Sequence, residues 1–222
     1  MNIIEFQNVT VKEQGKIILK DISFAISRGE KTVLWGKSGS GKSTILRTLL
    51  GGYSISEGSI RVDGLVLDRN SVNLIRNKIA YIGQEPVLGI GTVKQAMMFP
   101  FNFKANISIK PDASKLVQIL QRVGLPGSLL GVDASTVSGG EKQRIAVARA
   151  LLLQKKIFCI DEATSALDSD SAQIVVSLFR DEDCSILSVS HDPRWFAIAR
   201  RFLRIDNGKI VQDTTTRPEI KI

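Results

Sequence analysis

The chain has 222 residues, a length at which it can bury a large core as one α/β unit. Of these residues 43% are hydrophobic and 23% charged, an ordinary globular composition that argues against disorder. Its two cysteines, Cys159 and Cys184, are too few for a disulfide framework and lack metal-ligand spacing, so we expect reduced, structural thiols. The first residues show no export signal, and no window approaches the ~18 apolar residues of a membrane span. We therefore expect a cytoplasmic chain that does not cross a membrane by itself.

The formal net charge of +8 at pH 7 could indicate a nucleic-acid partner, an anionic membrane face or a nucleotide-binding surface. The basic residues occur as pairs, such as Lys155-Lys156 and Arg200-Arg201, and do not form runs. They also lack the interleaved aromatic residues that are typical of a groove for single-stranded nucleic acid. The charge therefore predicts a solvated basic surface, and we expect no direct binding of nucleic acid.

Hydrophobic patterns in the first third of the chain predict strands on either side of a glycine-rich loop. Residues 22–27 alternate between apolar and polar, as in a half-buried strand, and residues 32–35 form a short apolar run that suits a parallel sheet. After the loop, apolar residues at helical spacing in 45–50 predict a helix that ends at Gly51-Gly52. Alternation from residue 59 to 63 predicts an antiparallel strand.

The middle of the chain changes character after a short predicted strand at residues 79–82. Residues 85–137 contain four of the six prolines and a helical pattern from 115 to 123, which predicts a helical subdomain inserted into the core. Residues 1–84 and 138–222 would then form the core with an N-terminal β subdomain. Further predictions are a helix through Leu153, strands at 157–160 and 185–190, and a hairpin turn at 206–208.

Residues 36–43 match the phosphate-binding P-loop pattern G-x-x-x-x-G-K-[ST] and lie between a predicted strand and a predicted helix. Glycines in such a loop let backbone N–H groups surround phosphate oxygens at a helix N-terminus. We expect Lys42 to reach the β- and γ-phosphates and Ser43 to bind Mg²⁺. An ordinary Gly/Ser loop is the alternative, and the strand-loop-helix context argues against it. The residues expected to hold the nucleotide here are Gly36, Ser38, Gly39, Ser40, Gly41, Lys42, Ser43 and Thr44.

Two carboxylates, Asp161 and Glu162, follow the apolar strand at 157–160. We expect Asp161 to hold Mg²⁺ through its water shell and Glu162 to polarise the attacking water as general base. Two solvated acids at a strand end are the alternative, which the P-loop makes less favourable.

Two further polar residues also follow predicted strands. His191 is the only histidine, which excludes a multi-histidine metal site, and its place at a strand end favours a γ-phosphate contact over a purely structural role. Gln84 could bind Mg²⁺ or the attacking water through its amide, or it could be an ordinary surface residue.

Taken in order, these motifs resemble those of the ATP-binding cassette family. The matching elements are the P-loop, a Q-loop glutamine at Gln84, an SGG signature at 138–140, the Walker B strand ending in Asp161-Glu162, a D-loop at 165–168 and a switch histidine at His191. The resemblance implies ATP and Mg²⁺ as cofactors. It also implies an α/β fold: a P-loop NTPase core with a mainly parallel sheet, an N-terminal antiparallel β subdomain and an inserted helical subdomain.

The resemblance further implies a head-to-tail homodimer. In that arrangement Ser138, Gly139 and Gly140 of one cassette contact the γ-phosphate on the other cassette's P-loop, and Asp168 of the D-loop also belongs to the nucleotide site. N–H groups at a helix start suit an anion. The alternative is that Ser138 merely caps its own helix, with Glu141 in the first turn, and both roles can hold together.

In function, the resemblance implies an ATPase subunit that drives a membrane transporter and sits on the inner face of the membrane through a permease partner. Permease contacts are expected from residues 85–103, whose apolar side chains could equally pack the core of the helical subdomain. The segment from Gly91 to Phe101 and the compact length resemble small iron-efflux and aluminium-tolerance cassettes, which sets iron efflux as a hypothesis. Alternatives are a soluble cassette acting on nucleic acid or the ribosome, and a small-molecule kinase, against which the signature argues.

The sequence departs from the family pattern in two places. The signature begins with Val137 where the family usually has Leu, and has Glu141 where it usually has Gln. The stretch 12–16 offers no aromatic residue to stack on adenine, so we expect a base contact made in another way.

Overall fold

The computed structural model describes residues 1–181 and 183–218, which form two compact units. The first unit comprises the described residues of Met1–Ile79, Lys156–Asp161 and Asp183–Ile222. The second comprises those of Ala80–Lys155 and Glu162–Glu182. The predicted partition at residues 85–137 stays a prediction.

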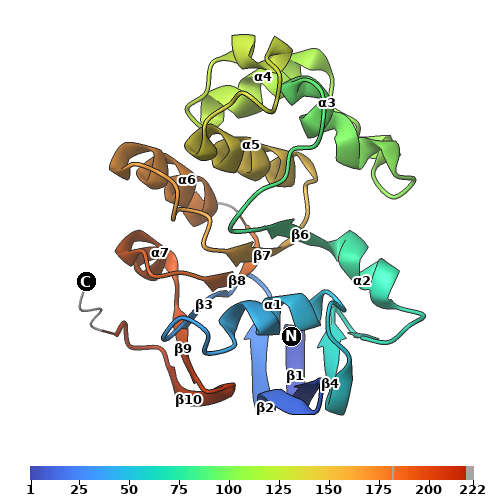
Figure 1. The fold of residues 1–222 in the computed structure, drawn as a ribbon, viewed down its shortest axis with the longest axis vertical. Helices are drawn as coiled ribbons and strands as arrows, with labels where there is room; N and C mark the ends of the chain where they lie inside the picture. The colour runs from blue at the N-terminus through green and yellow to red at the C-terminus, as the bar shows by residue number, and fades with distance from the viewer. Residues whose placement is uncertain (182, 219–222) are drawn as a thin grey trace. The chain divides into compact units, whose positions relative to one another are not determined.

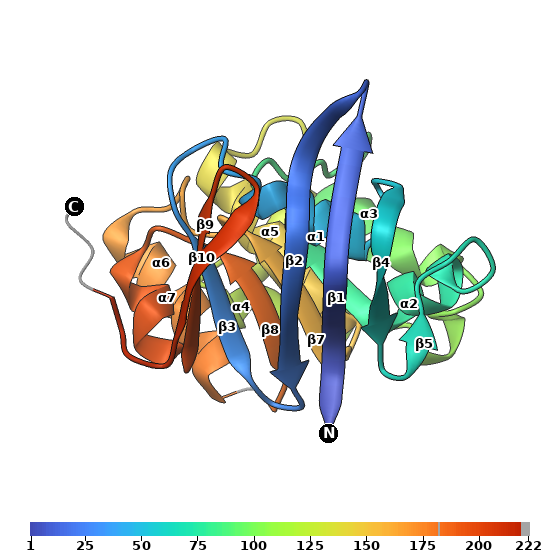
Figure 2. The same ribbon diagram turned by 90° about the horizontal axis from the view of Figure 1, so that it is seen from below.

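An antiparallel sheet in the first unit has the strand order β2-β1-β4-β5 (Figure 2). Phe6 pairs with Phe24 on one neighbouring strand and with Ile60 on the other, and the two phenylalanine rings stack with centroids 4.6 Å apart. The predicted strands around residues 22–27 and 59–63 are confirmed. The first strand has register shifts around Asn8, whose φ is +50°, so its apolar residues do not alternate regularly. The strands are β1 (Asn2–Glu13), β2 (Lys16–Ser27), β4 (Ile55–Val62) and β5 (Leu65–Val66).

A second, mainly parallel sheet contains the order β10-β9-β3-β8-β7. Strand β3 pairs in parallel with β8 and β9, β7 pairs in parallel with β8, and β9 and β10 form the predicted hairpin. Every residue of β7 and β8 is buried, as expected for strands inside a parallel sheet. The strands are β3 (Lys31–Trp35), β7 (Ile157–Asp161), β8 (Ser185–Val189), β9 (Arg201–Asp206) and β10 (Lys209–Thr214). The boundary between the units falls within a further strand, β6 (Ile79–Ile82).

Helix α1 (Lys42–Leu49) contacts β7 and β8 in the first unit. Its side chains Ile45, Leu46 and Leu49 are fully buried, and burying each stabilises the fold by about 1.5–3 kcal/mol. The buried face fixes the helix on the sheet, so its N-terminus has a defined position. The unit also contains α2 (Val72–Lys78) and α7 (Pro193–Ile198), which were not predicted.

Both cysteines are free and buried, as expected. Cys159 lies inside β7, and burial raises the pKa of its thiol to about 12. A thiol with so high a pKa is unreactive at neutral pH, which fits a structural role.

The second unit is built around α5 (Gly139–Leu152), which contacts three other helices (Figure 1). Ile145, Ala148 and Leu152 on α5 are buried, as the predicted helix requires. The other helices are α3 (Val93–Met98), α4 (Ala113–Arg122) and α6 (Ser169–Asp181), with short 3-10 turns η1 (Phe99–Asn102), η2 (Ile107–Ile109) and η3 (Gly127–Gly131). Among the described residues, no helix has the length and apolar character needed to cross a membrane.

Candidate active site

The predicted P-loop connects β3 to α1 and is held by neighbouring backbone. Gly36, Gly39 and Gly41 have φ values of +139°, +75° and +107°, which residues other than glycine rarely adopt. A Cβ at Gly36 would also collide with the carbonyl oxygen of Ile205. The loop conformation therefore depends on glycine both for its dihedral angles and for the space available.

The turn of the β9–β10 hairpin supports the same loop from another side. The N–H of Gly208 donates to the carbonyl oxygen of Ser40 over 2.9 Å, and the carbonyl of Gly208 accepts from the N–H of Lys20 over 2.8 Å. The hairpin turn therefore joins the P-loop to β2. The sequence predicted the turn but gave no sign of this contact, because it joins residues far apart in the chain.

Lys42 begins α1, and only 6% of its surface is exposed. Its Nζ donates to the carbonyl oxygens of Gly36 and Lys37 over 2.9 and 2.8 Å. The first turn of α1 contains no acidic residue, so the helix N-terminus and the ammonium together favour an anion.

Ser43 and Asp161 are brought together from the first turn of α1 and the end of β7. The hydroxyl of Ser43 donates to Oδ1 of Asp161 over 3.0 Å, and Asp161 is only 2% exposed. A hydroxyl and a carboxylate are the hard oxygen ligands that Mg²⁺ prefers. The pair therefore fits the predicted metal role, which stays a prediction.

His191 lies at the same edge of the parallel sheet. Val189, the last residue of β8, pairs with both Leu34 and Asp161, so the carboxyl ends of β3, β7 and β8 are level. His191 follows two residues later and is exposed, and its ring forms no hydrogen bond with the part of the chain that the structure describes. Its side chain is therefore available to a ligand at this edge.

Gln84 and Glu162 come together in the second unit. Nε2 of Gln84 donates to Oε2 of Glu162 over 3.1 Å. Glu162 has a φ of +50°, an uncommon value for a residue with a side chain and one that occurs more often at functional sites. Its carbonyl oxygen accepts from the N–H and the hydroxyl of Ser165 over 3.1 and 2.9 Å, which closes a tight turn.

The SGG signature begins α5 with a capping box. The side chain of Ser138 accepts from the N–H of Glu141 over 3.3 Å, and the Glu141 carboxylate accepts from the N–H of Ser138 over 2.8 Å, which lowers its pKa. The capping role is thus confirmed, and it suits a glutamate at this position as well as a glutamine. An added Cβ at Gly139 would meet no atom within 4 Å, whereas one at Gly140 would lie 3.3 Å from the carbonyl oxygen of Ala166. The phosphate-binding role stays a prediction.

Asp168 caps α6. Its two carboxylate oxygens accept from the N–H and the hydroxyl of Ser171 over 2.9 and 2.8 Å, and the backbone hydrogen bond is the main reason that the pKa of Asp168 is lowered. The structure thus gives Asp168 a local role, and its contact with nucleotide stays a prediction.

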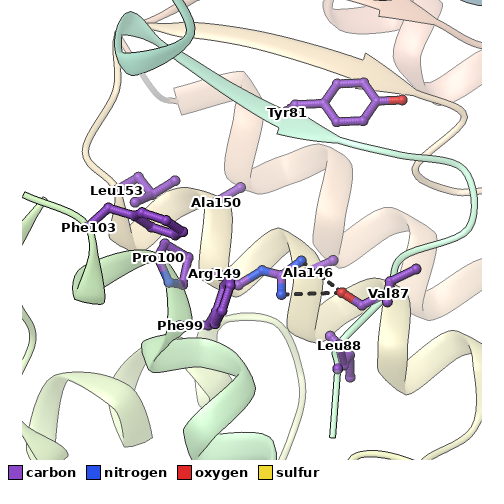
Figure 3. Close-up of a pocket in the computed structure, with 11 residues that line it drawn as sticks. Tyr81, Val87, Leu88, Phe99, Pro100, Phe103, Ala146, Arg149, Ala150 and Leu153 are labelled. Carbon is purple, nitrogen blue, oxygen red and sulfur yellow. Dashed lines mark hydrogen bonds between the residues drawn. The ribbon is translucent and has the colours of Figure 1, made fainter. Parts of the chain in front are cut away.

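The apolar segment after Gln84 contains both buried and exposed side chains. Leu88, Met97 and Phe101 are buried in the second unit, whereas Phe99 and Phe103 are 57% and 55% exposed. The exposed rings line a pocket of about 460 Å³ that the sequence did not predict (Figure 3). Other lining residues are Tyr81, Val87, Leu88, Gly89, Pro100, Ala146, Arg149, Ala150 and Leu153.

The model of the ABC transporter family matches residues 19–165. A similar solved structure is the dimeric structure of MJ0796, a bacterial ABC transporter cassette: it is 25% identical, superposes with a TM-score of 0.84, and the match covers 97% of this chain and 100% of that one. The predicted fold class is confirmed.

Relatives found by sequence comparison also support this family. The energy-coupling factor transporter ATP-binding protein EcfA1 of Ligilactobacillus salivarius is 33% identical over 96% of this chain and 77% of its own length. The ATP-dependent permease MDL1 of Candida albicans is 35% identical over 95% of this chain, which spans only 32% of that protein. The chain therefore belongs to the ABC transporter family of ATPases.

Proposed function

We propose that this chain is the ATP-hydrolysing subunit of a membrane transporter and works as a head-to-tail pair. The observation that supports this best is the contact between Ser43 and Asp161 beside the glycine loop and Lys42. It places oxygen ligands for a metal next to a phosphate-binding helix N-terminus. The relatives add the transport context, since their names describe a permease and a transporter ATP-binding protein.

In the proposed reaction, loop N–H groups and Lys42 bind the phosphates of ATP, and His191 contacts the γ-phosphate. Ser43 and Asp161 would hold Mg²⁺, which would neutralise negative charge on the phosphate oxygens. Gln84 is a further oxygen ligand that the family resemblance implies. Glu162, whose backbone carbonyl is held by Ser165, accepts a proton from the attacking water.

A second copy completes each site. One chain contains one P-loop and one signature, so Ser138, Gly139 and Gly140 contact the γ-phosphate on a partner copy, with Asp168 beside it. The open space around Gly139 leaves room for such an approach. A dimeric structure of a similar cassette supports this arrangement.

The partner that couples hydrolysis to transport is an integral membrane permease, which would hold the chain at the cytoplasmic face of the membrane. Its contact is the exposed part of residues 85–103, where Val87, Phe99 and Phe103 present apolar surface. For the cargo, the resemblance to iron-efflux cassettes makes export of a metal ion the hypothesis to test first.

The substitution Glu162→Gln tests the chemistry. It removes the general base but keeps the size of the side chain, so we expect hydrolysis to fall by about 10²–10⁴-fold while ATP binding persists. Phosphate release and a fluorescent-ATP titration measure the two separately. Normal turnover by the variant would contradict the proposed role of Glu162. If the purified chain carried nucleic acid and no membrane protein, the alternative of a soluble cassette would be favoured.

A further inference from the structure

His191 stands between two residues that are anchored in the fold. Strand β8 ends at Val189 and leads through residues 190–192 into α7 (Figure 1). Ser190, which precedes the histidine, is only 2% exposed, whereas the histidine itself is exposed. Asp192, which follows it, is the N-cap of α7. The exposed ring therefore extends from a short turn that is held at both ends.

The buried hydroxyl of Ser190 closes this turn. Its Oγ accepts from the N–H of Asp192 over 3.0 Å, so the hydrogen bond joins the residues on either side of His191. A serine hydroxyl that bonds to the backbone two residues further on forms a local turn and restricts the φ and ψ angles of the residue between. The hydrogen bond therefore restricts where the Cα of His191 lies relative to β8.

Asp192 anchors the other end of the turn. Its Oδ1 accepts from the N–H of Arg194 over 2.9 Å, and its two oxygens accept from Nη1 of Arg194 over 3.2 and 3.1 Å. The helix that it begins is packed into the first unit through Trp195 and Phe196, which are 1% and 2% exposed. The backbone after His191 therefore cannot shift without disturbing a helix cap and buried contacts.

The ring of His191 is free where its backbone is held. Among residues 1–181 and 183–218, the ring forms no hydrogen bond, so both of its nitrogens are available to a ligand. A side chain on a fixed backbone loses less conformational entropy on binding than one on a mobile loop. The turn therefore favours a contact between this ring and a ligand at the carboxyl edge of the sheet.

We infer that Ser190 and Asp192 are positioning residues for ATP hydrolysis and act only through His191: they hold its backbone so that its ring reaches the γ-phosphate. The inference rests on the proposed function, in which His191 makes that contact, and adds the residues that set its position. Neither side chain has to touch the nucleotide, since both already accept hydrogen bonds from the protein. A displacement of about 1 Å can lower a rate by on the order of 10²-fold, so a backbone anchor is enough to affect turnover.

A double-mutant cycle tests the inference against a merely structural role. Ser190→Ala should lower the kcat of the purified chain by about fivefold or more with little change in KM, because the hydrogen bond that closes the turn is lost. In a chain that already carries His191→Ala, the same substitution should leave kcat unchanged, because the residue through which Ser190 acts is gone.

Ser188→Ala is the matched control. Ser188 is also a buried serine, within β8, and is 1% exposed. Its hydroxyl donates to the carbonyl oxygen of Thr32 over 3.2 Å and has no part in the turn at His191. Its loss should reduce the free energy of unfolding without a comparable fall in kcat.

Asp192 provides a second pair of variants, which decides the matter if Ser190→Ala does not fold. Asp192→Asn keeps an N-cap acceptor and should retain most of the turnover. Asp192→Ala removes the acceptor and should lower kcat by about as much as Ser190→Ala does.

The ring of His191 also gives a direct readout, because it belongs to the only histidine in the chain. In the chain without a histidine tag, ATP with Mg²⁺ should shift the imidazole NMR signals. Ser190→Ala should reduce that shift by about half or more at saturating ATP, because fewer of the rings contact the phosphate.

The outcomes separate the inference from the proposed function. The inference alone is overturned by normal kcat in Ser190→Ala, by an equal loss with and without His191→Ala, by an undiminished NMR shift, or by equal losses in Asp192→Asn and Asp192→Ala. Normal kcat in His191→Ala, or an NMR signal that ATP does not shift in the unsubstituted chain, would instead contradict the proposed contact of His191 with the γ-phosphate and remove the inference with it.

Discussion

The two units hold their functional groups in different ways. In the first unit the contacts are long-range: Ser43 and Asp161 are 118 residues apart, and Gly208 supports Ser40 from another hairpin. In the second unit most contacts are local, as in Ser138 with Glu141 and Glu162 with Ser165, each three residues apart. The first arrangement requires the whole sheet to be folded, whereas the second, apart from the contact of Gln84 with Glu162, needs only a turn or a helix start. Substitutions should therefore affect stability more strongly in the first unit than in the second.

The largest effect is expected for Gly36→Ala. The new Cβ would meet the carbonyl oxygen of Ile205 at a φ of +139°, so we expect at least about 3 kcal/mol loss in the free energy of unfolding. Urea unfolding measures it. Gly29→Ala is the matched control, because its φ of +79° is also positive but no atom lies within 4 Å of the added Cβ. Equal losses in both variants would show that the close approach to β9 is unimportant.

A smaller effect is expected for Ser138→Ala, which removes the N-cap of α5. The loss of this hydrogen bond should cost about 1 kcal/mol in the free energy of unfolding. The substitution Ser138→Gly should lower the free energy of unfolding by only a few tenths of a kcal/mol, since glycine is also a favourable N-cap residue. If Ser138 also contacts the γ-phosphate on a partner copy, as proposed, Ser138→Ala should reduce ATP hydrolysis by more than the loss of stability explains. Turnover is therefore measured at a temperature below the unfolding transition, where the variant is folded. A variant with the stability loss but full turnover would limit Ser138 to capping.

Ser165→Ala should change stability less than Ser138→Ala does. Its hydroxyl provides one of two hydrogen bonds to the carbonyl of Glu162, and the backbone N–H bond remains. We expect turnover to fall by roughly fivefold with little change in KM, because about 1 kcal/mol is lost from the turn that holds the backbone of the proposed base. Steady-state kinetics separates the two constants. A rise in KM alone would instead indicate altered binding of ATP.

The smallest effect is the pH dependence of the α6 cap. The pKa of Asp168 is lower in the folded chain than the ordinary value near 3.9, so the folded state favours the charged carboxylate. Its stabilising contribution is present above that ordinary pKa and is lost as pH falls through the lower folded pKa. Asp168→Asn should therefore flatten the fall in stability below about pH 4. If both chains show the same acid-induced fall, the cap does not contribute to it.

The sequence predicted the elements with strong patterns and the residues that define motifs. The buried run at 157–160 in β7 was identified because a strand covered on both faces is continuously apolar. Helix α6 was not predicted although it is amphipathic, because it begins with Ser-Asp-Ser, residue types that favour turns and caps over helix interiors. The pairing of Ser43 with Asp161 could be expected from parallel strand ends meeting at one sheet edge.

Other parts of the site could not be predicted because they depend on tertiary contacts. Arg149 shares a helix face with Ala146, Ala150 and Leu153, a spacing that reads as an ordinary core-facing stripe with one surface charge. Its relation to Phe99 and Phe103 appears only in the fold, where residues far apart in the sequence line one pocket. The support of the P-loop by Gly208 is hidden for the same reason.

The hydrogen bonds of Lys42 set a threshold for any anion that approaches the loop. The ammonium already donates to two carbonyl oxygens within 2.9 Å, so a phosphate that displaces either of them must compete for that donor. Only the difference between the new and the old contacts adds to affinity. A weakly charged anion would therefore bind with little affinity. A polyphosphate would bind more tightly, because it also forms hydrogen bonds with the loop N–H groups and Ser43. The loop's own carbonyls thereby act as a filter that favours multiply charged ligands.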